Sequence, residues 1–189
     1  MQRRSFLRTA AALAPAAGLH PLLAVQAAAQ TAAQAQTPEL HIVGDGQDRF
    51  AHPHSLGFSS ILSKIAPSET EGRLFLIEHR NLVPGGPPLH LHLNQEEWFY
   101  VMEGEVAFQV GEQRLQLKAG QSVLAPRRVP HTFSSVSATP SRLMIAFCPA
   151  GKMEDYFRDT EQGGTPSDPV AYFRRYEMEY VGPSPFLKS

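Results

Sequence analysis

The sequence contains a single cysteine, Cys148, among its 189 residues. One thiol cannot form a disulfide within the chain, so no disulfide framework supports the fold. Cys148 ends the apolar run LMIAFC, and we expect it to be a small buried core residue. A scaffold held together by disulfides is therefore excluded.

The chain also lacks an excess of either charge. It has 17 basic and 18 acidic residues, a formal net charge of −1, and arginines that are scattered along the sequence. Proteins that bind nucleic acid concentrate positive charge on one face, so this composition argues against a nucleic-acid partner. With 42% hydrophobic residues and no internal repeat, the chain suits one globular domain.

Residues 1–29 are predicted to be an export signal peptide. Basic residues come first, an Ala/Leu stretch follows, and small residues suited to cleavage after Ala27 or Ala29 come last. The run RRSFLR at residues 3–8 resembles the twin-arginine export signal, with an ordinary secretory signal as the alternative. Pro15 and Pro21 interrupt the weakly apolar stretch, so we expect no stable membrane insertion after cleavage. The expected location is periplasmic or otherwise exported.

Residues 57–150 lack a helical period. After a turn-rich lead-in segment at residues 30–56, about nine short apolar or alternating runs follow, separated by Gly, Pro, Asn and Ser. So many short strands predict an all-β protein, with a single jelly-roll-like β-barrel as the first choice.

The last segment, residues 151–189, is predicted to be a helical extension and tail. Residues 152–160 favour a short amphipathic helix, and Asp168-Pro169 suits the start of a second one that runs to Arg175. The tail looks extended, and Pro183 and Pro185 exclude it from the centre of a sheet.

The stretch PGGPPLHLHLNQEEWFYVMEG places His90 and His92 one residue apart. On a strand the two side chains share a face about 6.6 Å apart, close enough to chelate one ion, whereas on a helix they diverge by about 200°. The Gly/Pro run before them excludes a helix at that point. Two hydrogen-bonded structural histidines are the alternative, so a metal site requires a further ligand.

Glu96 and Glu97 are both candidates for the carboxylate ligand. On a straight strand Glu96 would lie about 13 Å beyond His92, far outside bonding distance. The chain must therefore turn at Asn94-Gln95, and the next strand must run back beside the first. Both faces of that next strand are apolar, so its alternation does not choose between the two glutamates.

Two motifs resemble those of the cupin family. In HLHLNQEEWFYVMEG, the HxH pair is followed by four residues, Glu97, six residues and Gly104, and this spacing prefers Glu97 over Glu96. In GQSVLAPRRVPHTFSS, Gly120, Pro126 and His131 match the second cupin motif.

The second motif departs from the cupin pattern at two positions. Arg128 stands where a glycine is usual, which puts the turn geometry in question, and Ser135 stands where an asparagine is usual. The resemblance covers residues 57–150 and implies a single-domain cupin barrel with one divalent transition metal: Fe, Mn, Ni, Co, Cu or Zn. The implied metal ligands are His90, His92, Glu97 and His131.

Within the cupins, the PGGPP loop and the segment FCPAGKMEDYFRD look most similar to single-domain relatives of the quercetin dioxygenases. This resemblance implies a metal-dependent dioxygenase that acts on an enolisable or flavonol-like small molecule with dioxygen, and a homodimer. Glu97 is the catalytic candidate, as ligand, base or both. A non-redox isomerase or lyase, and a non-catalytic periplasmic binding protein for a metal or small ligand, are the alternatives.

Other residues have weaker functional interpretations. An apolar pocket able to hold an aromatic ring is one expectation, with ordinary core as the alternative, for Phe99, Val101, Phe108 and Phe133. We expect His79 to have a hydrogen-bonded structural role. A second HxH pair, His52 and His54, lies in the turn-rich lead-in and is expected to consist of surface histidines.

Overall fold

The computed structural model describes residues 40–160 and 166–187, and residues from Ile42 onward form one unit. The predicted signal peptide lies outside the described residues. Among those that are described, no helix is both long enough and apolar enough to cross a membrane.

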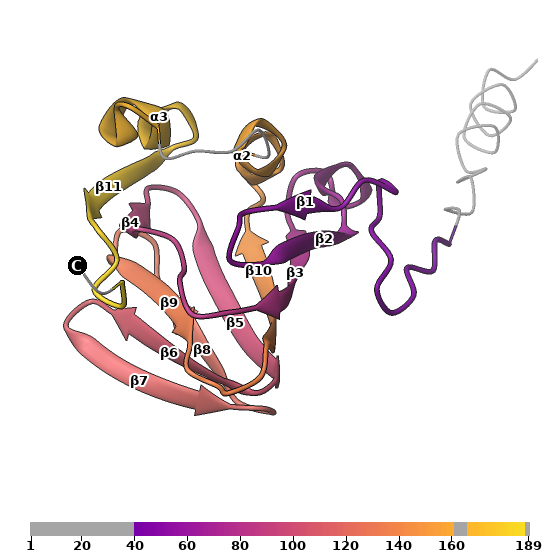
Figure 1. Ribbon diagram of the computed structural model, residues 1–189. Coiled ribbons are helices and arrows are strands. Elements are labelled where there is room, and N and C mark those ends of the chain that lie inside the picture. The colour runs from indigo at the N-terminus through magenta and orange to yellow at the C-terminus, as the bar shows by residue number, and fades with distance from the viewer. Residues whose placement is uncertain (1–39, 161–165, 188–189) are drawn as a thin grey trace, which may run out of the picture. The chain divides into compact units, whose positions relative to one another are not determined.

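The strands form two antiparallel sheets (Figure 1). The six-stranded sheet has the order β1-β2-β3-β10-β5-β8, and the five-stranded sheet has the order β11-β4-β9-β6-β7. The strands of the first sheet are β1 (His54–Ser55), β2 (Ser60–Ile65), β3 (Phe75–Leu82), β10 (Ser141–Cys148), β5 (Glu96–Glu103) and β8 (Ser122–Ala125). Those of the second are β11 (Met178–Gly182), β4 (Leu89–His92), β9 (His131–Ser135), β6 (Glu105–Val110) and β7 (Gln113–Lys118). The predicted all-β fold is confirmed, since each expected run corresponds to one of the strands β2 to β10.

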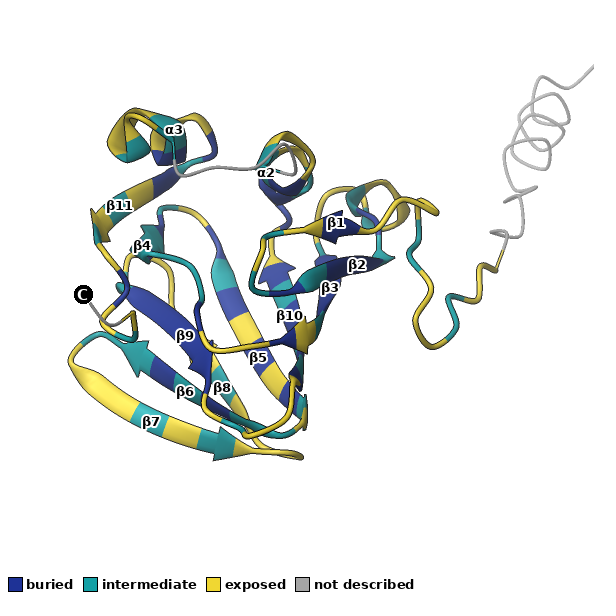
Figure 2. Cartoon of the chain, viewed as in Figure 1, coloured by how far each residue is buried: buried dark blue, intermediate teal, exposed yellow. Residues whose placement is uncertain are grey.

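The hydrophobic core lies between the two sheets. Phe99 on β5 packs across the barrel against Phe108 on β6 and Phe133 on β9, with ring centroids 5.2 and 5.7 Å apart. Inward and outward residues alternate along β5, so Glu97, Phe99 and Val101 are buried while Trp98 is partly exposed (Figure 2). This alternation places a carboxylate inside the barrel.

The expectation that Cys148 is buried is wrong, because Cys148 is exposed. Along β10 the residues Leu143, Ile145 and Phe147 point into the core, so the next residue points outward. The last buried position of β10 is Phe147, so the two-residue period of the strand points the Cys148 side chain outward.

Both predicted C-terminal helices are present and lie at one end of the barrel (Figure 1): α2 (Met153–Thr160) and α3 (Pro169–Arg175). Asp168 caps α3, because its Oδ1 accepts a hydrogen bond from the backbone N–H of Ala171 at 3.0 Å. The tail then forms β11 beside β4, at the edge of the five-stranded sheet, in agreement with the prolines that follow it. A short 3-10 helix, η1 (Pro67–Thr70), links β2 and β3.

The end of the lead-in is attached to the first sheet. Asp48 accepts hydrogen bonds from the backbone of Phe50, His52 and Ser63, the last at 2.6 Å. His52 is exposed as expected, but His54 on β1 is buried, because β1 pairs with β2. The expectation of two surface histidines is therefore wrong for His54.

The Gly/Pro loop before β4 lies directly against β9. The N–H of Gly85 donates to Ser134 Oγ at 3.1 Å, and Thr132 Oγ1 donates to the carbonyl of Pro87 at 2.7 Å. Gly86 has φ +126°, and a Cβ there would lie 1.9 Å from the carbonyl oxygen of Phe133. Only glycine allows this approach, which sets where β4 begins.

We expect Gly86→Ala to lower the free energy of unfolding by roughly 2–4 kcal/mol, through steric overlap added to backbone strain. Gly57→Ala is the matched control, because Gly57 also has positive φ (+79°) but has open space around it. The control should lose about 1 kcal/mol. Urea denaturation of both variants measures the difference, and equal losses would contradict a steric requirement at Gly86.

Candidate metal centre

Three histidines and one glutamate converge inside the barrel. His90 and His92 lie on β4, and His131 begins β9, where it pairs directly with His90. Glu97 reaches them from β5 in the other sheet. All four side chains are buried, and their donor atoms all lie within 4.8 Å of one another. Ligand atoms about 2.0–2.2 Å from one ion are at most about 4.4 Å apart. The four donor atoms would therefore have to approach one another by only a few tenths of an ångström to bind one ion.

The structure distinguishes the two adjacent glutamates. Glu96 pairs with Arg127 near the surface, with Arg127 Nη2 donating to Oε2 at 2.6 Å. Glu97 is 4% exposed and faces the histidines. The expectation that the next strand runs back beside β4 is wrong, because β5 pairs with β10 and β8 in the other sheet. The inward face of β5 brings the Glu97 carboxylate to the site from that sheet.

The other ring nitrogen of each histidine is already engaged. His90 Nδ1 lies 2.8 Å from the carbonyl oxygen of Pro88, and His131 Nδ1 lies 2.9 Å from that of Val129. His92 Nδ1 lies 3.2 Å from Oε1 of Gln95. These oxygens accept hydrogen bonds, so each neutral ring carries its proton on Nδ1 and directs the lone pair of Nε2 into the site.

The inward-facing atoms require a cation. Glu97 Oε2 lies 2.7 Å from His131 Nε2 and 3.1 Å from His92 Nε2. His92 Nε2 is buried and has no hydrogen-bond partner among the described residues. A carboxylate oxygen and imidazole lone pairs repel one another at this separation unless a proton or a metal ion lies between them. The residues present therefore fit a divalent transition metal.

Burial and neighbouring charges set the protonation of the site. Burial, then the charges of His131 and His92, lower the pKa of His90 from 6.5 to about 3. For Glu97, burial acts to raise the pKa, but in the metal-free site the attraction to His131 and His92, with a hydrogen bond from His131 when its Nε2 carries a proton, outweighs burial and holds the pKa below its ordinary value. Near neutral pH, His90 is uncharged and Glu97 ionised, which are the forms that bind metal.

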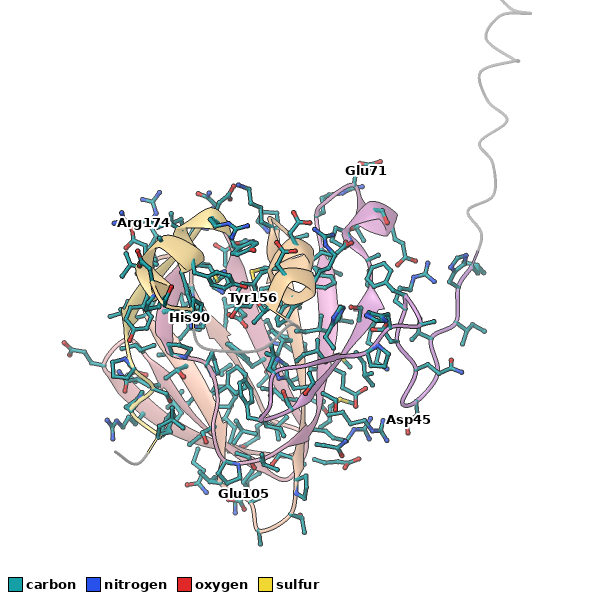
Figure 3. The ribbon with its side chains drawn as sticks, turned by 45° about the horizontal axis from the view of Figure 1, so that its top comes forward. Asp45, Glu71, His90, Glu105, Tyr156 and Arg174 are labelled. Atoms are coloured by element: carbon teal, nitrogen blue, oxygen red, sulfur yellow. The ribbon has the colours of Figure 1, made fainter. Side chains whose placement is uncertain are left out.

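Two cavities lead to the four residues. The inner one, about 30 Å³, includes His90, His92 and Glu97 in its wall. The outer one measures about 370 Å³ and opens under α2 and α3. Four residues belong to both walls: Leu56, Phe58, Pro87 and Tyr156. In Figure 3, His90 and Tyr156 lie at the end of the barrel that bears these helices, and Glu105 lies at the other end.

The predicted aromatic pocket is only partly present. Phe133 lines the inner cavity, but Phe99, Val101 and Phe108 are at most 1% exposed and belong to the core below it. His79 also lines the inner cavity, and its Nδ1 lies 2.8 Å from Ser59 Oγ. Burial lowers the pKa of His79 to about 3, so it is a neutral structural histidine near neutral pH.

The sequence analysis missed several residues of the cavity walls. Met153, Tyr156 and Phe157 on α2 line the inner cavity, and Tyr172 and Phe173 on α3 line the outer one. The available signal was a Tyr-Phe pair in each of the two short helices, Tyr156-Phe157 and Tyr172-Phe173. Adjacent aromatic side chains on a short helix indicate an apolar surface against which they pack. Gln95, treated only as a turn residue, is fully buried beside His92.

The departures in the second motif are accommodated locally. Arg128 adopts the left-handed conformation (φ 63°) that glycine usually supplies. Its backbone N–H donates to the carbonyl of His92 at 2.7 Å, which ties the turn before His131 to β4. Ser135 is buried, and its hydroxyl contacts that of Ser141 at 2.9 Å, away from the four residues.

We expect Glu97→Gln to weaken metal binding at least 100-fold, because an amide oxygen is a poorer ligand and cannot balance the charge of a divalent ion. Glu96→Gln is the matched control and should change affinity by less than about twofold, since its partner is Arg127. Competition between protein and a chelator for Co²⁺ or Zn²⁺ gives both affinities. Equal effects would contradict the distinction between the two glutamates.

Comparison with known proteins shows two sequence similarities. Residues 79–147 match the family model of the cupin domain. An uncharacterised protein of Methanocaldococcus jannaschii is 26% identical over 76 residues, a match that covers 39% of this chain and 61% of that relative.

Two solved structures share the fold. An RmlC-like cupin from Shewanella frigidimarina superposes with a TM-score of 0.50 at 20% identity, covering 61% of this chain and 96% of that one. A protein from Thermotoga maritima named as a predicted oxalate decarboxylase gives 0.52 at 13% identity, covering 58% and 99%. Residues 79–147 are therefore similar in sequence to the cupin domain, and the chain shares an all-β fold with these two solved structures.

Proposed function

We propose that this protein is a mononuclear metal-dependent enzyme, a dioxygenase that acts on an enolisable or flavonol-like small molecule. One observation carries the proposal: three imidazole Nε2 atoms and one carboxylate converge, all buried, beside a cavity whose outer part is apolar. The cupin domain and its fold support a metal site but leave the reaction open.

The donor set suits a redox-active or redox-inert first-row ion. Three imidazoles and one carboxylate occupy four positions, so an octahedral ion keeps two for exogenous ligands. A bound metal would supply Lewis acidity, lowering the pKa of a substrate hydroxyl, and a redox-active one would also supply electrons for dioxygen chemistry. Glu97 would accept the hydroxyl proton, and the surrounding apolar side chains would exclude water.

The cavity walls favour an uncharged apolar substrate. Among the described residues, no lysine or arginine lines either cavity, and Glu97 is the single acidic one. A phosphorylated sugar or a dicarboxylate would find no counter-charge except the metal itself. The outer cavity of about 370 Å³ falls within the range of small-molecule sites. Aromatic and proline side chains in its wall suit a planar ring: Phe58, Pro87, Pro88, Tyr156, Tyr172 and Phe173.

The oxygen requirement separates three candidate functions. A dioxygenase should consume about one dioxygen per molecule of a flavonol such as quercetin when the protein carries a redox-active metal. Product should disappear under nitrogen and in His131→Ala, because that variant removes one of the four ligands. Oxygen-electrode traces and product analysis measure both quantities.

Each other result favours an alternative. Turnover that persists without oxygen and with zinc would support an isomerase or lyase. Saturable binding of the flavonol without any product would support a binding protein.

We also propose that the protein is exported by the twin-arginine route, on the basis of RRSFLR at residues 3–8. Replacing Arg3 and Arg4 together by lysine should retain the full-length protein in the cytoplasm, whereas Arg8→Lys should not. Cell fractionation followed by immunoblotting measures the distribution. Unchanged export of the double variant would favour the ordinary secretory route.

A further inference from the structure

Gln95 is a buried polar side chain next to the candidate metal centre. It lies in the turn between β4 and β5 and is 0% exposed. A buried amide has to satisfy both its oxygen and its nitrogen, so its partners show what it holds in place.

The two ends of the Gln95 amide have different partners. Nε2 donates to the carbonyl oxygen of Ala150 at 3.0 Å. A carbonyl can only accept, which fixes the nitrogen on that side and directs Oε1 towards His92 Nδ1, 3.2 Å away. His92 therefore donates from Nδ1 and keeps the lone pair of Nε2 for the site.

His92 differs from the other two histidines in this respect. His90 and His131 are oriented by backbone carbonyls, those of Pro88 and Val129, which no substitution of those residues removes. His92 is oriented by a side chain. The tautomer and aim of one of the three imidazoles thus depend on the identity of residue 95.

The other end of Gln95 reaches the start of helix α2. The carbonyl of Ala150 also accepts from the N–H of Met153 at 3.3 Å, in the first turn of α2. Gly151 leaves room for the amide, because a Cβ at that position would lie 1.9 Å from Gln95 Nε2. Helix α2 in turn contributes Met153, Tyr156 and Phe157 to the wall of the inner cavity.

We propose that Gln95 is a positioning residue that orients His92 towards the metal and anchors helix α2, through Ala150, as a wall of the same cavity. This inference rests on the metal-binding part of the proposed function. Gln95 does not itself touch the reacting atoms. It acts through His92 on one side and through the helix on the other.

Three variants separate this role from a merely structural one. Gln95→Leu keeps the approximate size and removes both hydrogen bonds, whereas Gln95→Glu keeps an oxygen that can accept from His92. Ser141→Ala is the matched control: Ser141 is equally buried and hydrogen-bonded, but to Ser135 and Glu105 at the end of the barrel away from His90 (Figure 3).

The first measurement is the affinity for Co²⁺, by chelator competition. Gln95→Leu should bind 10–100-fold more weakly than the wild type, the usual effect of losing a partner that orients a ligand. Gln95→Glu should stay within about threefold of the wild type or bind more tightly, since a carboxylate raises the basicity of its histidine. Ser141→Ala should be unchanged. The orienting role would be overturned if Gln95→Leu bound Co²⁺ as tightly as the wild type. It would also be overturned if Gln95→Glu lost as much affinity for Co²⁺ as Gln95→Leu.

The second measurement is amide hydrogen exchange in the metal-free protein. Backbone amides of α2 should exchange at least tenfold faster in Gln95→Leu than in the wild type, while the strands β6 and β7 remain unchanged. Unchanged protection of α2 would overturn the anchoring role. If Gln95→Leu fails to fold, Gln95→Glu still tests the orienting role. Gln95→Met, which has no donor and only a weakly accepting sulfur, then takes the place of Gln95→Leu in both assays.

Different results would contradict the proposed metal-binding function and the proposed role of Gln95. Failure of the wild type to bind Co²⁺ or any other divalent transition metal would remove the proposed function, and the exchange experiment would still test the link to α2. Binding by the wild type with no loss in Gln95→Leu would remove this inference alone.

Discussion

Four donor atoms from two different sheets have to meet within 4.8 Å inside the barrel. His90, His92 and His131 lie on neighbouring strands of one sheet, whereas Glu97 lies on the other. The site therefore exists only when both sheets close around the same core. The loop against β9, the turn at Asn94-Gln95 and the pairing of β4 with β9 each serve to place these atoms.

The charges of the site explain why a cation belongs there. A buried carboxylate is costly unless it is paired, and among the residues that the structure describes Glu97 makes its close polar contacts with the imidazoles of His92 and His131. The Nδ1 atoms of these imidazoles face acceptor oxygens, so their lone pairs point at the carboxylate rather than away from it. Buried apolar side chains around the cluster strengthen every one of these interactions. A divalent metal would satisfy all four residues at once.

Much of this architecture was predictable from the sequence. Alternating runs and the positions of Gly and Pro indicated nine strands and two short helices, because the periods of two and 3.6 are local properties. The resemblance to the cupin motifs implied the four converging residues. Strand alternation alone did not choose between Glu96 and Glu97, since both faces of β5 are apolar; the spacing of the cupin-like motif did prefer Glu97. Phe99 and Phe108 belong to the core rather than to the cavity, whose walls combine strand and loop residues with side chains of α2 and α3. Nothing in the sequence of the turn indicated that the Gln95 side chain would be buried. The homodimer, the exported location and the reaction remain predictions.

X-ray absorption spectroscopy at the edge of the native metal, on protein purified from its own compartment, tests the central claim most directly. The predicted result is one transition-metal ion per chain with a first shell of nitrogen and oxygen, in which the multiple scattering requires three imidazoles, and which loses one imidazole in His131→Ala. A first shell with fewer than three imidazoles, or protein without a stoichiometric metal, would contradict the account.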